Sequence, residues 1–175
     1  MDKYFYHLDL PPMDQYFINE AEHADFKLTS YPNLYRADCS FYNMPFFKLL
    51  NDRFGECYAK YYLTPPNSFY DWHVDMNRYC VINWVIKTNK EARTYFREPI
   101  EEARIPDRKP IMYHLTEVDY CGAKPTLLNA TYEHCVANNY NERRIILSMS
   151  LFKPTTYQEV LEFLKPLKIR NYSLT

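Results

Sequence analysis

Residues 70–78 read Tyr-Asp-Trp-His-Val-Asp-Met-Asn-Arg and stand between two strand-like runs of the sequence. Side chains alternate between the two faces of a β-strand, so His73 and Asp75, two positions apart, should point the same way. An imidazole beside a carboxylate supplies two of the three protein ligands of a facial metal triad, whose third ligand is another histidine. This stretch therefore predicts a strand over 69–75 that carries part of a metal centre.

The third ligand must come from a distant part of the chain. His134 is the candidate, because Arg144 follows it by ten residues and opens the apolar run 144–152. Three conditions then agree: the two-residue spacing of His73 and Asp75, a second histidine further along the chain, and an arginine ten residues after that histidine. A short motif alone would not provide this agreement. We therefore expect His73, Asp75 and His134 to bind one metal ion.

The triplet His-x-Asp is weak evidence without this context. It occurs twice more, at residues 7–9 and 23–25, where no such partner follows. An isolated histidine is more often a hydrogen-bonded structural residue than a metal ligand. We expect structural roles for the remaining histidines, which are His7, His23 and His114.

Short strand-like runs separated by polar turns dominate the chain from residue 56 onward. About eight strands are predicted, at residues 3–10, 57–63, 69–75, 79–87, 94–97, 111–115, 126–128 and 144–152. The run 79–87 is almost entirely apolar and β-branched, as in a central strand that is buried on both faces. Many short strands with polar turns favour a sandwich or a jelly roll.

Three helices are predicted around these strands. The first runs from an N-cap at Asp14 to about residue 24. The second begins at an N-cap Asn43, has Pro45 in its first turn and ends at Gly55. The third opens with the capping box at 156–159 and stops before Pro166, and residues 101–109 form a charged loop or a short helix.

Length and composition set the limits of the interpretation. With 175 residues, the chain suits one domain over 1–175, with a core at about 56–152, a supporting segment at 1–55 and a C-terminal helix at 156–165. A net charge of −1 gives no basic footprint for a nucleic-acid partner. Five cysteines without a Cys-x-x-Cys pair indicate a reducing, cytoplasmic location, and the absence of a long apolar span indicates no membrane partner. The oligomeric state is not predicted.

The set His73, Asp75, His134 and Arg144 resembles that of the Fe(II)- and 2-oxoglutarate-dependent oxygenase superfamily. Residues 125–136, Pro-Thr-Leu-Leu-Asn-Ala-Thr-Tyr-Glu-His-Cys-Val, are similar to the late strand and turn of that superfamily. The resemblance covers about residues 56–152 and extends to small prolyl and aspartyl/asparaginyl hydroxylase-like proteins, some of them encoded by tailed phages. It implies a mainly β fold with flanking helices, the double-stranded β-helix or cupin-like jelly roll, and the host cytoplasm as the location of a phage-encoded member.

The resemblance also implies a cofactor and a co-substrate. Fe(II) would bind the catalytic triad, and 2-oxoglutarate would bind the iron. In the superfamily a basic residue about ten positions after the distal histidine binds the far carboxylate of 2-oxoglutarate, so that role falls to Arg144. Its planar guanidinium suits a carboxylate, because it can donate two parallel hydrogen bonds. Ser148, four residues further along the same strand, should lie on the same face.

Two further residues are candidates for the 2-oxoglutarate site. Asn83 is the polar exception in an apolar strand and either contacts 2-oxoglutarate or pairs with a neighbouring strand. Tyr62 on the preceding strand is a second candidate for the far carboxylate. Asp71 either supports a metal ligand or is a solvated turn residue. Arg78 and Arg97 either reach an acidic group of the substrate or are exposed, and exposed positions are expected. Arg143 is also expected to be exposed, and Cys135 to be a packing residue.

The implied function is hydroxylation of a peptide side chain or a small molecule by O₂, coupled to decarboxylation of 2-oxoglutarate to succinate. A second hypothesis is a cupin-like metal-binding jelly roll, an isomerase or a ligand-binding module, without 2-oxoglutarate chemistry. It would keep the three metal ligands and would not need Arg144 inside the barrel. A third hypothesis is a degenerate jelly roll that serves as an interaction domain and binds no metal. The substrate itself is not readable from the sequence.

Overall fold

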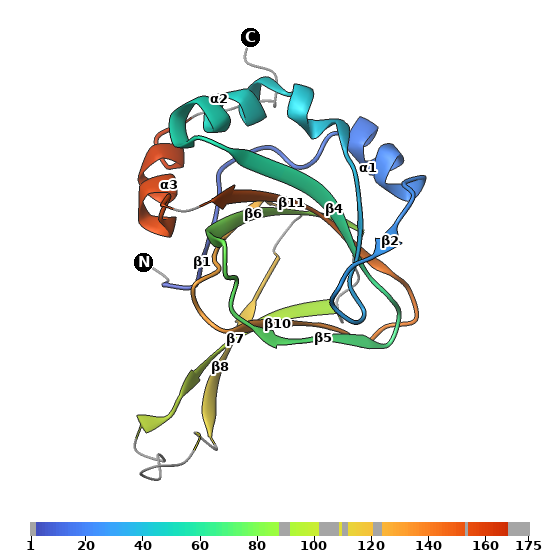
Figure 1. Cartoon of the computed structure of the whole chain (residues 1–175), viewed down its shortest axis with the longest axis vertical. Coiled ribbons are helices and arrows are strands. Elements are labelled where there is room, and N and C mark those ends of the chain that lie inside the picture. The colour runs from blue at the N-terminus through green and yellow to red at the C-terminus, as the bar shows by residue number, and fades with distance from the viewer. Residues whose placement is uncertain are drawn as a thin grey trace.

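Two antiparallel β-sheets lie face to face in the computed structural model, which describes residues 3–87, 92–101, 109, 112–120, 124–152 and 154–167 (Figure 1). The larger sheet, in spatial order, contains β1 (Phe5–His7), β9 (Thr126–Asn129), β6 (Arg78–Lys87), β11 (Arg144–Phe152), β4 (Cys57–Thr64), β3 (Tyr35–Ala37) and β2 (Lys27–Leu28). The smaller sheet contains β5 (Ser68–His73), β10 (His134–Asn138), β7 (Ala92–Pro99) and β8 (Tyr113–Val118). Strands β7 and β8 extend beyond the two-sheet body (Figure 1).

Helices cover the outer face of the larger sheet, away from the smaller one (Figure 1). They are α1 (Gln15–Glu22), the short 3₁₀ helix η1 (Ser40–Asn43), α2 (Pro45–Phe54) and α3 (Tyr157–Leu164). As expected, the Asp14 carboxylate accepts from the backbone N–H of Tyr16 at the start of α1. The capping box between Thr156 and Glu159 is also formed. None of the described helices combines the length and the apolar character that crossing a bilayer requires.

The N-terminus of α2 differs from the sequence prediction. Asn43 is the last residue of η1, and Met44 is the N-cap of α2 without a side-chain hydrogen bond. Pro45 occupies the first turn, where its missing N–H costs nothing, and Gly55 ends the helix with a φ of 83°, as the sequence indicates. The chain therefore enters α2 directly from a 3₁₀ turn, which takes the place of the predicted asparagine cap.

The central strands of the larger sheet divide their side chains between two environments. The outward-facing residues of β4, β6 and β11 join one apolar cluster with the helices, including Tyr61, Trp84 and Leu147, each 0% exposed. The inward-facing residues of the same strands face the smaller sheet and include polar groups such as Asn83 and Arg144. As the apolar run predicts, β6 is buried on both faces from residue 80 to 85.

The strand predictions need three corrections. The predicted strand 69–75 ends at His73, so Asp75 lies in the loop that follows β5. Strand β10 was not predicted as a separate strand, because its short sequence His-Cys-Val-Ala-Asn ends in polar residues. The first strand covers only Phe5–His7 of the predicted 3–10. The predicted charged segment 101–109 falls mostly outside the described residues.

Candidate metal centre

The two candidate histidines lie directly opposite each other on paired strands. His73 at the end of β5 is the register partner of His134 at the start of β10, and their ring centroids are 4.2 Å apart. The Nδ1 of His73 lies 2.7 Å from the carbonyl oxygen of Asp71, and the Nδ1 of His134 lies 2.9 Å from that of Tyr132. Each ring is therefore held by the backbone two residues before it.

These two hydrogen bonds determine the tautomers. A carbonyl oxygen can only accept, so Nδ1 of each ring must carry the proton and donate it. A neutral imidazole with Nδ1–H keeps the lone pair on Nε2, which is then free to bind a metal. A histidine that binds a metal commonly donates a hydrogen bond from its other ring N–H to a carbonyl or carboxylate in this way. For Asp71, the backbone carbonyl supports the ligand, while the carboxylate accepts from the N–H of Trp72.

Asp75 reaches the two histidines from the loop after β5. Its backbone N–H donates to the carbonyl of Ala130 at 3.2 Å. One ligand atom from each of His73, Asp75 and His134 lies within 4.8 Å of the others. Asp75 therefore lies near the two histidines, as the two-residue spacing predicts. It does so from a loop, because β5, which was expected to carry it, ends at His73.

The local environment favours the neutral form of the buried histidine. His134 is 8% exposed, and the ring of Phe96 packs against it with a centroid distance of 5.6 Å. Desolvation, together with the nearby His73, lowers the pKa of His134 to about 4. Its imidazole is therefore neutral near pH 7, which is the form that binds metal.

The donor set fits a divalent transition metal. Two imidazole nitrogens and one carboxylate oxygen are the ligands of the 2-His-1-carboxylate triad, typical of non-haem Fe(II). Ligand bonds of about 2.1 Å at right angles, as a facial triad requires, place the ligand atoms about 3.0 Å apart. Side-chain rotations that shorten the present separations, which are all within 4.8 Å, would therefore complete the site.

A buried arginine lies in the same cavity between the sheets. The side chains that line this cavity come from both sheets, and they include the three candidate ligands and Arg144. Arg144 is 2% exposed, and its NH2 donates to the Thr94 hydroxyl at 3.1 Å. Its guanidinium also lies 5.3 Å from the centre of the Tyr120 ring. Among the described residues no carboxylate pairs with it, and its Nε has no hydrogen-bond partner.

The other predicted contact residues of 2-oxoglutarate also line this cavity. Tyr62, Asn83 and Ser148 do so together with Arg144. Asn83 is 6% exposed, and its Oδ1 has no partner among the described residues. An unpaired buried amide normally costs stability, so a polar ligand would offset that cost. Arg143 points elsewhere, and its NH2 donates to the carbonyl of Glu22 at the surface.

Three predicted structural residues lie outside the cluster. His7 Nδ1 is 3.0 Å from the Thr126 hydroxyl, and His23 Nδ1 is 2.8 Å from the carbonyl of Asn19. Cys135 is 1% exposed, and burial raises the pKa of its thiol to about 12, so it is an inert packing residue.

Two arginines that were expected to be exposed are instead paired and partly buried. The fork of Arg78 binds the Asp75 carboxylate, with Nε to Oδ2 at 2.7 Å and NH2 to Oδ1 at 3.2 Å. Arg97 binds Glu133 in the same manner and stacks between the rings of Trp72 and Tyr113. The sequence signal for this ion pair was the three-residue spacing of Arg78 from Asp75, because a tight loop can bring two side chains at that spacing together.

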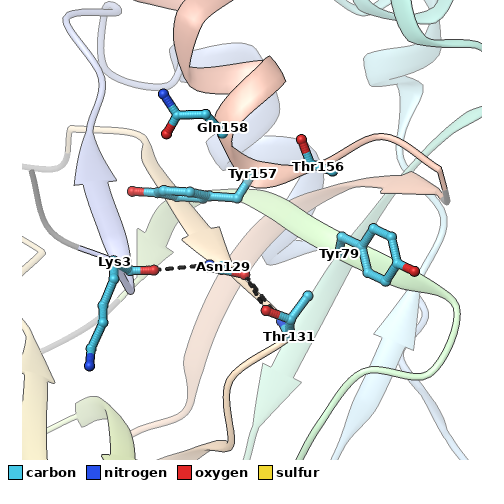
Figure 2. A pocket seen from close by; sticks show the side chains of 7 residues that line it. All are labelled: Lys3, Tyr79, Asn129, Thr131, Thr156, Tyr157 and Gln158. Atoms are coloured by element: carbon cyan, nitrogen blue, oxygen red, sulfur yellow. Dashed lines mark hydrogen bonds between the residues drawn. The ribbon is translucent and has the colours of Figure 1, made fainter.

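Another cavity, of about 520 Å³, lies away from the candidate metal ligands at the start of α3 (Figure 2). Its polar side chains already have partners. Asn129 donates to the carbonyl of Lys3 and accepts from Thr131, and Thr156 belongs to the capping box (Figure 2). The orphaned polar atoms of Asn83 and Arg144 lie in the other cavity, which is therefore the candidate site despite its smaller size.

Solved structures with the same fold are known. A prolyl-4-hydroxylase from Pseudomonas putida aligns with a TM-score of 0.59 at 11% identity, over 85% of this chain and 92% of that chain. HygX from Streptomyces hygroscopicus, solved with nickel and 2-oxoglutarate bound, aligns with a TM-score of 0.54 at 13% identity, over 82% of this chain and 79% of that chain. No protein-family model and no curated protein matches the sequence.

These likenesses establish the class of fold. The two facing antiparallel sheets form a jelly roll, so the prediction of a mainly β double-stranded β-helix with flanking helices is confirmed. At such low identity the likeness shows the fold alone, because one fold hosts many functions. The chemistry of the site has to be argued from its own residues.

Proposed function

We propose that this protein is an Fe(II)- and 2-oxoglutarate-dependent oxygenase that hydroxylates a peptide side chain or a small molecule. One observation carries the proposal: a buried guanidinium without a carboxylate partner shares a cavity with a His-Asp-His cluster. A buried charge is costly unless it is paired, so Arg144 favours an anionic ligand in this cavity. A metal-binding jelly roll without an anionic co-substrate has no need of that charge.

Arg144 and the metal ligands divide the binding of 2-oxoglutarate between them. The metal would bind His73, Asp75 and His134, and Arg144 would donate to the far carboxylate of the co-substrate. Ser148 and Asn83 line the same cavity as Arg144 and would supply a hydroxyl and an amide for the same ligand. Fe(II), when bound, supplies the redox chemistry that couples decarboxylation of 2-oxoglutarate to hydroxylation by O₂.

Thr94 and Tyr120 hold Arg144 in place for this task. The Thr94 hydroxyl lies 3.1 Å from both NH2 of Arg144 and the hydroxyl of Tyr120. This series of hydrogen bonds fixes one edge of the guanidinium and leaves Nε without a partner. A guanidinium that is fixed before binding loses less conformational entropy when the ligand arrives.

The cavity has a volume of about 60 Å³, well below the several hundred cubic ångströms of typical ligand pockets. Binding a five-carbon dicarboxylate therefore requires lining side chains to move apart. Leu34 and Tyr70 line the cavity and lie on a loop and on an edge strand, where such movement costs least.

The test begins under anaerobic conditions. Apoprotein is mixed with Fe(II) and then with 2-oxoglutarate, and the visible charge-transfer band of the chelated keto acid is recorded. Wild type should give the band, His134→Ala should lose it together with Fe(II) binding, and Arg144→Met should bind Fe(II) but need at least tenfold more 2-oxoglutarate, since a charged hydrogen bond is worth about 1.5–3 kcal/mol. The neighbouring Arg143→Met is the matched control and should behave as wild type.

The alternatives predict different results in the same experiment. Fe(II) binding without a band in wild type would favour the cupin-like hypothesis without 2-oxoglutarate. A band that does not depend on Arg144 would show that Arg144 does not bind the far carboxylate. If wild type binds no metal at all, the degenerate jelly roll remains. The hydroxylated substrate is sought only once wild type has given the charge-transfer band.

A further inference from the structure

The three candidate ligands are not held equally by the backbone. His73 and His134 lie on paired strands, and each ring donates to a backbone carbonyl. Asp75 lies past the end of β5, in a loop with no strand partner, between the exposed Val74 and Met76. Its backbone N–H bond to Ala130 fixes the main chain but leaves the side-chain torsions of the carboxylate free.

Arg78 supplies the missing restraint on this carboxylate. Its Nε and NH2 bind the two oxygens of Asp75 at 2.7 and 3.2 Å. Its NH1 donates to the hydroxyl of Ser150 on β11 at 2.6 Å, which anchors the guanidinium to the sheet. The side chains of Arg78 and Asp75 are only 24% and 12% exposed, and no other ion pair of the described residues is as buried on both sides.

We propose that Arg78 is a positioning residue for the metal centre: it orients the Asp75 carboxylate as the two carbonyls orient the histidine rings. The inference rests on the proposed metal site and extends it to a residue that acts through the Asp75 carboxylate. Each of the three ligands then has its own fixed partner. Partners of this kind typically contribute a factor of about 10–100 to metal affinity.

A simple charge argument gives the opposite sign. Arg78 is a cation beside a cation site, so by Coulomb's law alone its removal should tighten metal binding. The orientation argument says that removal loosens binding, because the freed carboxylate must be ordered when the metal arrives. Both side chains retain some contact with solvent, which weakens the Coulombic repulsion, and the fork geometry is lost completely on substitution. We therefore expect orientation to dominate.

Titration of apoprotein with Co(II), followed by its visible absorption, measures the effect directly. Arg78→Gln should raise the Kd for Co(II) about 10–100-fold. Arg78→Lys keeps the charge and loses the fork, so it should also weaken binding, by at least about threefold, since a point charge cannot bind both oxygens. Arg93→Gln, which breaks the Arg93–Glu117 pair on β7 and β8, is the control and should leave the Kd within about twofold.

A double-mutant cycle separates positioning from a general structural role. If Arg78 acts through Asp75, Arg78→Lys should have no further effect on the Kd once Asp75→Ala is present. Thermal unfolding of each apoprotein identifies variants that lose the fold, and Arg78→Lys is the variant that keeps most of the packing. A Kd for either Arg78 variant that equals or falls below that of wild type would overturn the inference, as would an equal effect in the Asp75→Ala background.

The outcome also distinguishes this inference from the proposed function. Wild type that binds no Co(II) removes the metal site, and with it both proposals. Wild type that binds Co(II) tightly while the Arg78 variants bind equally well leaves the metal site standing and removes only the role of Arg78.

Discussion

Both faces of β11 carry buried side chains, and yet the two faces have opposite polarity. On the outer face Ile145, Leu147 and Met149 are each 0% exposed and pack in the apolar cluster beneath the helices. On the inner face Arg144 and Ser148, 2% and 4% exposed, line the cavity that contains the three candidate metal ligands. Neighbouring residues of β11 therefore face opposite environments. One side is a fully packed apolar core, and the other is a cavity whose polar groups are not all hydrogen-bonded.

The difference lies in partners and not in burial. Every buried atom of an apolar side chain gains from packing, so the outer face is complete in the protein alone. On the inner face Arg144 Nε and Asn83 Oδ1 have no partner among the described residues. Proteins tolerate such atoms mainly where a ligand or water completes them. A buried face with orphaned polar atoms therefore identifies the site better than the larger, fully paired cavity beside α3.

The largest expected effect tests the outer face. Leu147→Ala should lower the free energy of unfolding by about 2–5 kcal/mol, because the rigid core cannot fill the cavity left behind. Urea denaturation of the apoprotein measures it. Co(II) affinity at a temperature where the variant remains folded should stay within about twofold of wild type, since Leu147 points away from the cluster. A large loss of metal affinity would show that the two faces are coupled.

A smaller effect of the opposite sign should follow on the inner face. Arg144→Met should raise the free energy of unfolding of the apoprotein by about 1–3 kcal/mol, because replacing an unpaired buried charge with an apolar side chain removes its desolvation penalty. The same denaturation experiment measures this change, with Arg143→Met, whose half-buried side chain lies away from the cavity, as the control. If Arg144→Met destabilises the apoprotein strongly, the guanidinium is a structural group with its contacts satisfied by Thr94 and Tyr120.

Much of this contrast could be predicted from the sequence, because a strand has a period of two. Arg144 and Ser148 stand four residues apart in the run 144–152, and this spacing predicts that they share one face of the strand. The two-residue spacing of His73 and Asp75 and the position of His134 predicted that three candidate ligands come together, as they do. Their functional roles remain predictions, since only their placement is observed.

The parts that escaped prediction depend on contacts between distant segments. Where β5 ends is set by its pairing with β10, and β10 itself is too short and polar to be recognised alone. Arg78 was expected to be exposed because arginine usually is, and only the folded chain brings Ser150 beside it to anchor the fork around Asp75. Local patterns therefore predicted the faces of strands but not the partners that complete them.

The smallest expected effect sharpens the comparison within the inner face. Ser148→Ala should leave the free energy of unfolding within about 1 kcal/mol of wild type, because the methyl group fits where the hydroxyl was. It should raise the 2-oxoglutarate concentration that half-saturates the charge-transfer band about 5–30-fold, as expected for one lost hydrogen bond to a carboxylate. Arg143→Met, whose side chain bonds to the carbonyl of Glu22 away from the cavity, is the control and should leave that concentration unchanged. A half-saturating concentration for Ser148→Ala equal to that of wild type would mean that the Ser148 hydroxyl does not contact the co-substrate.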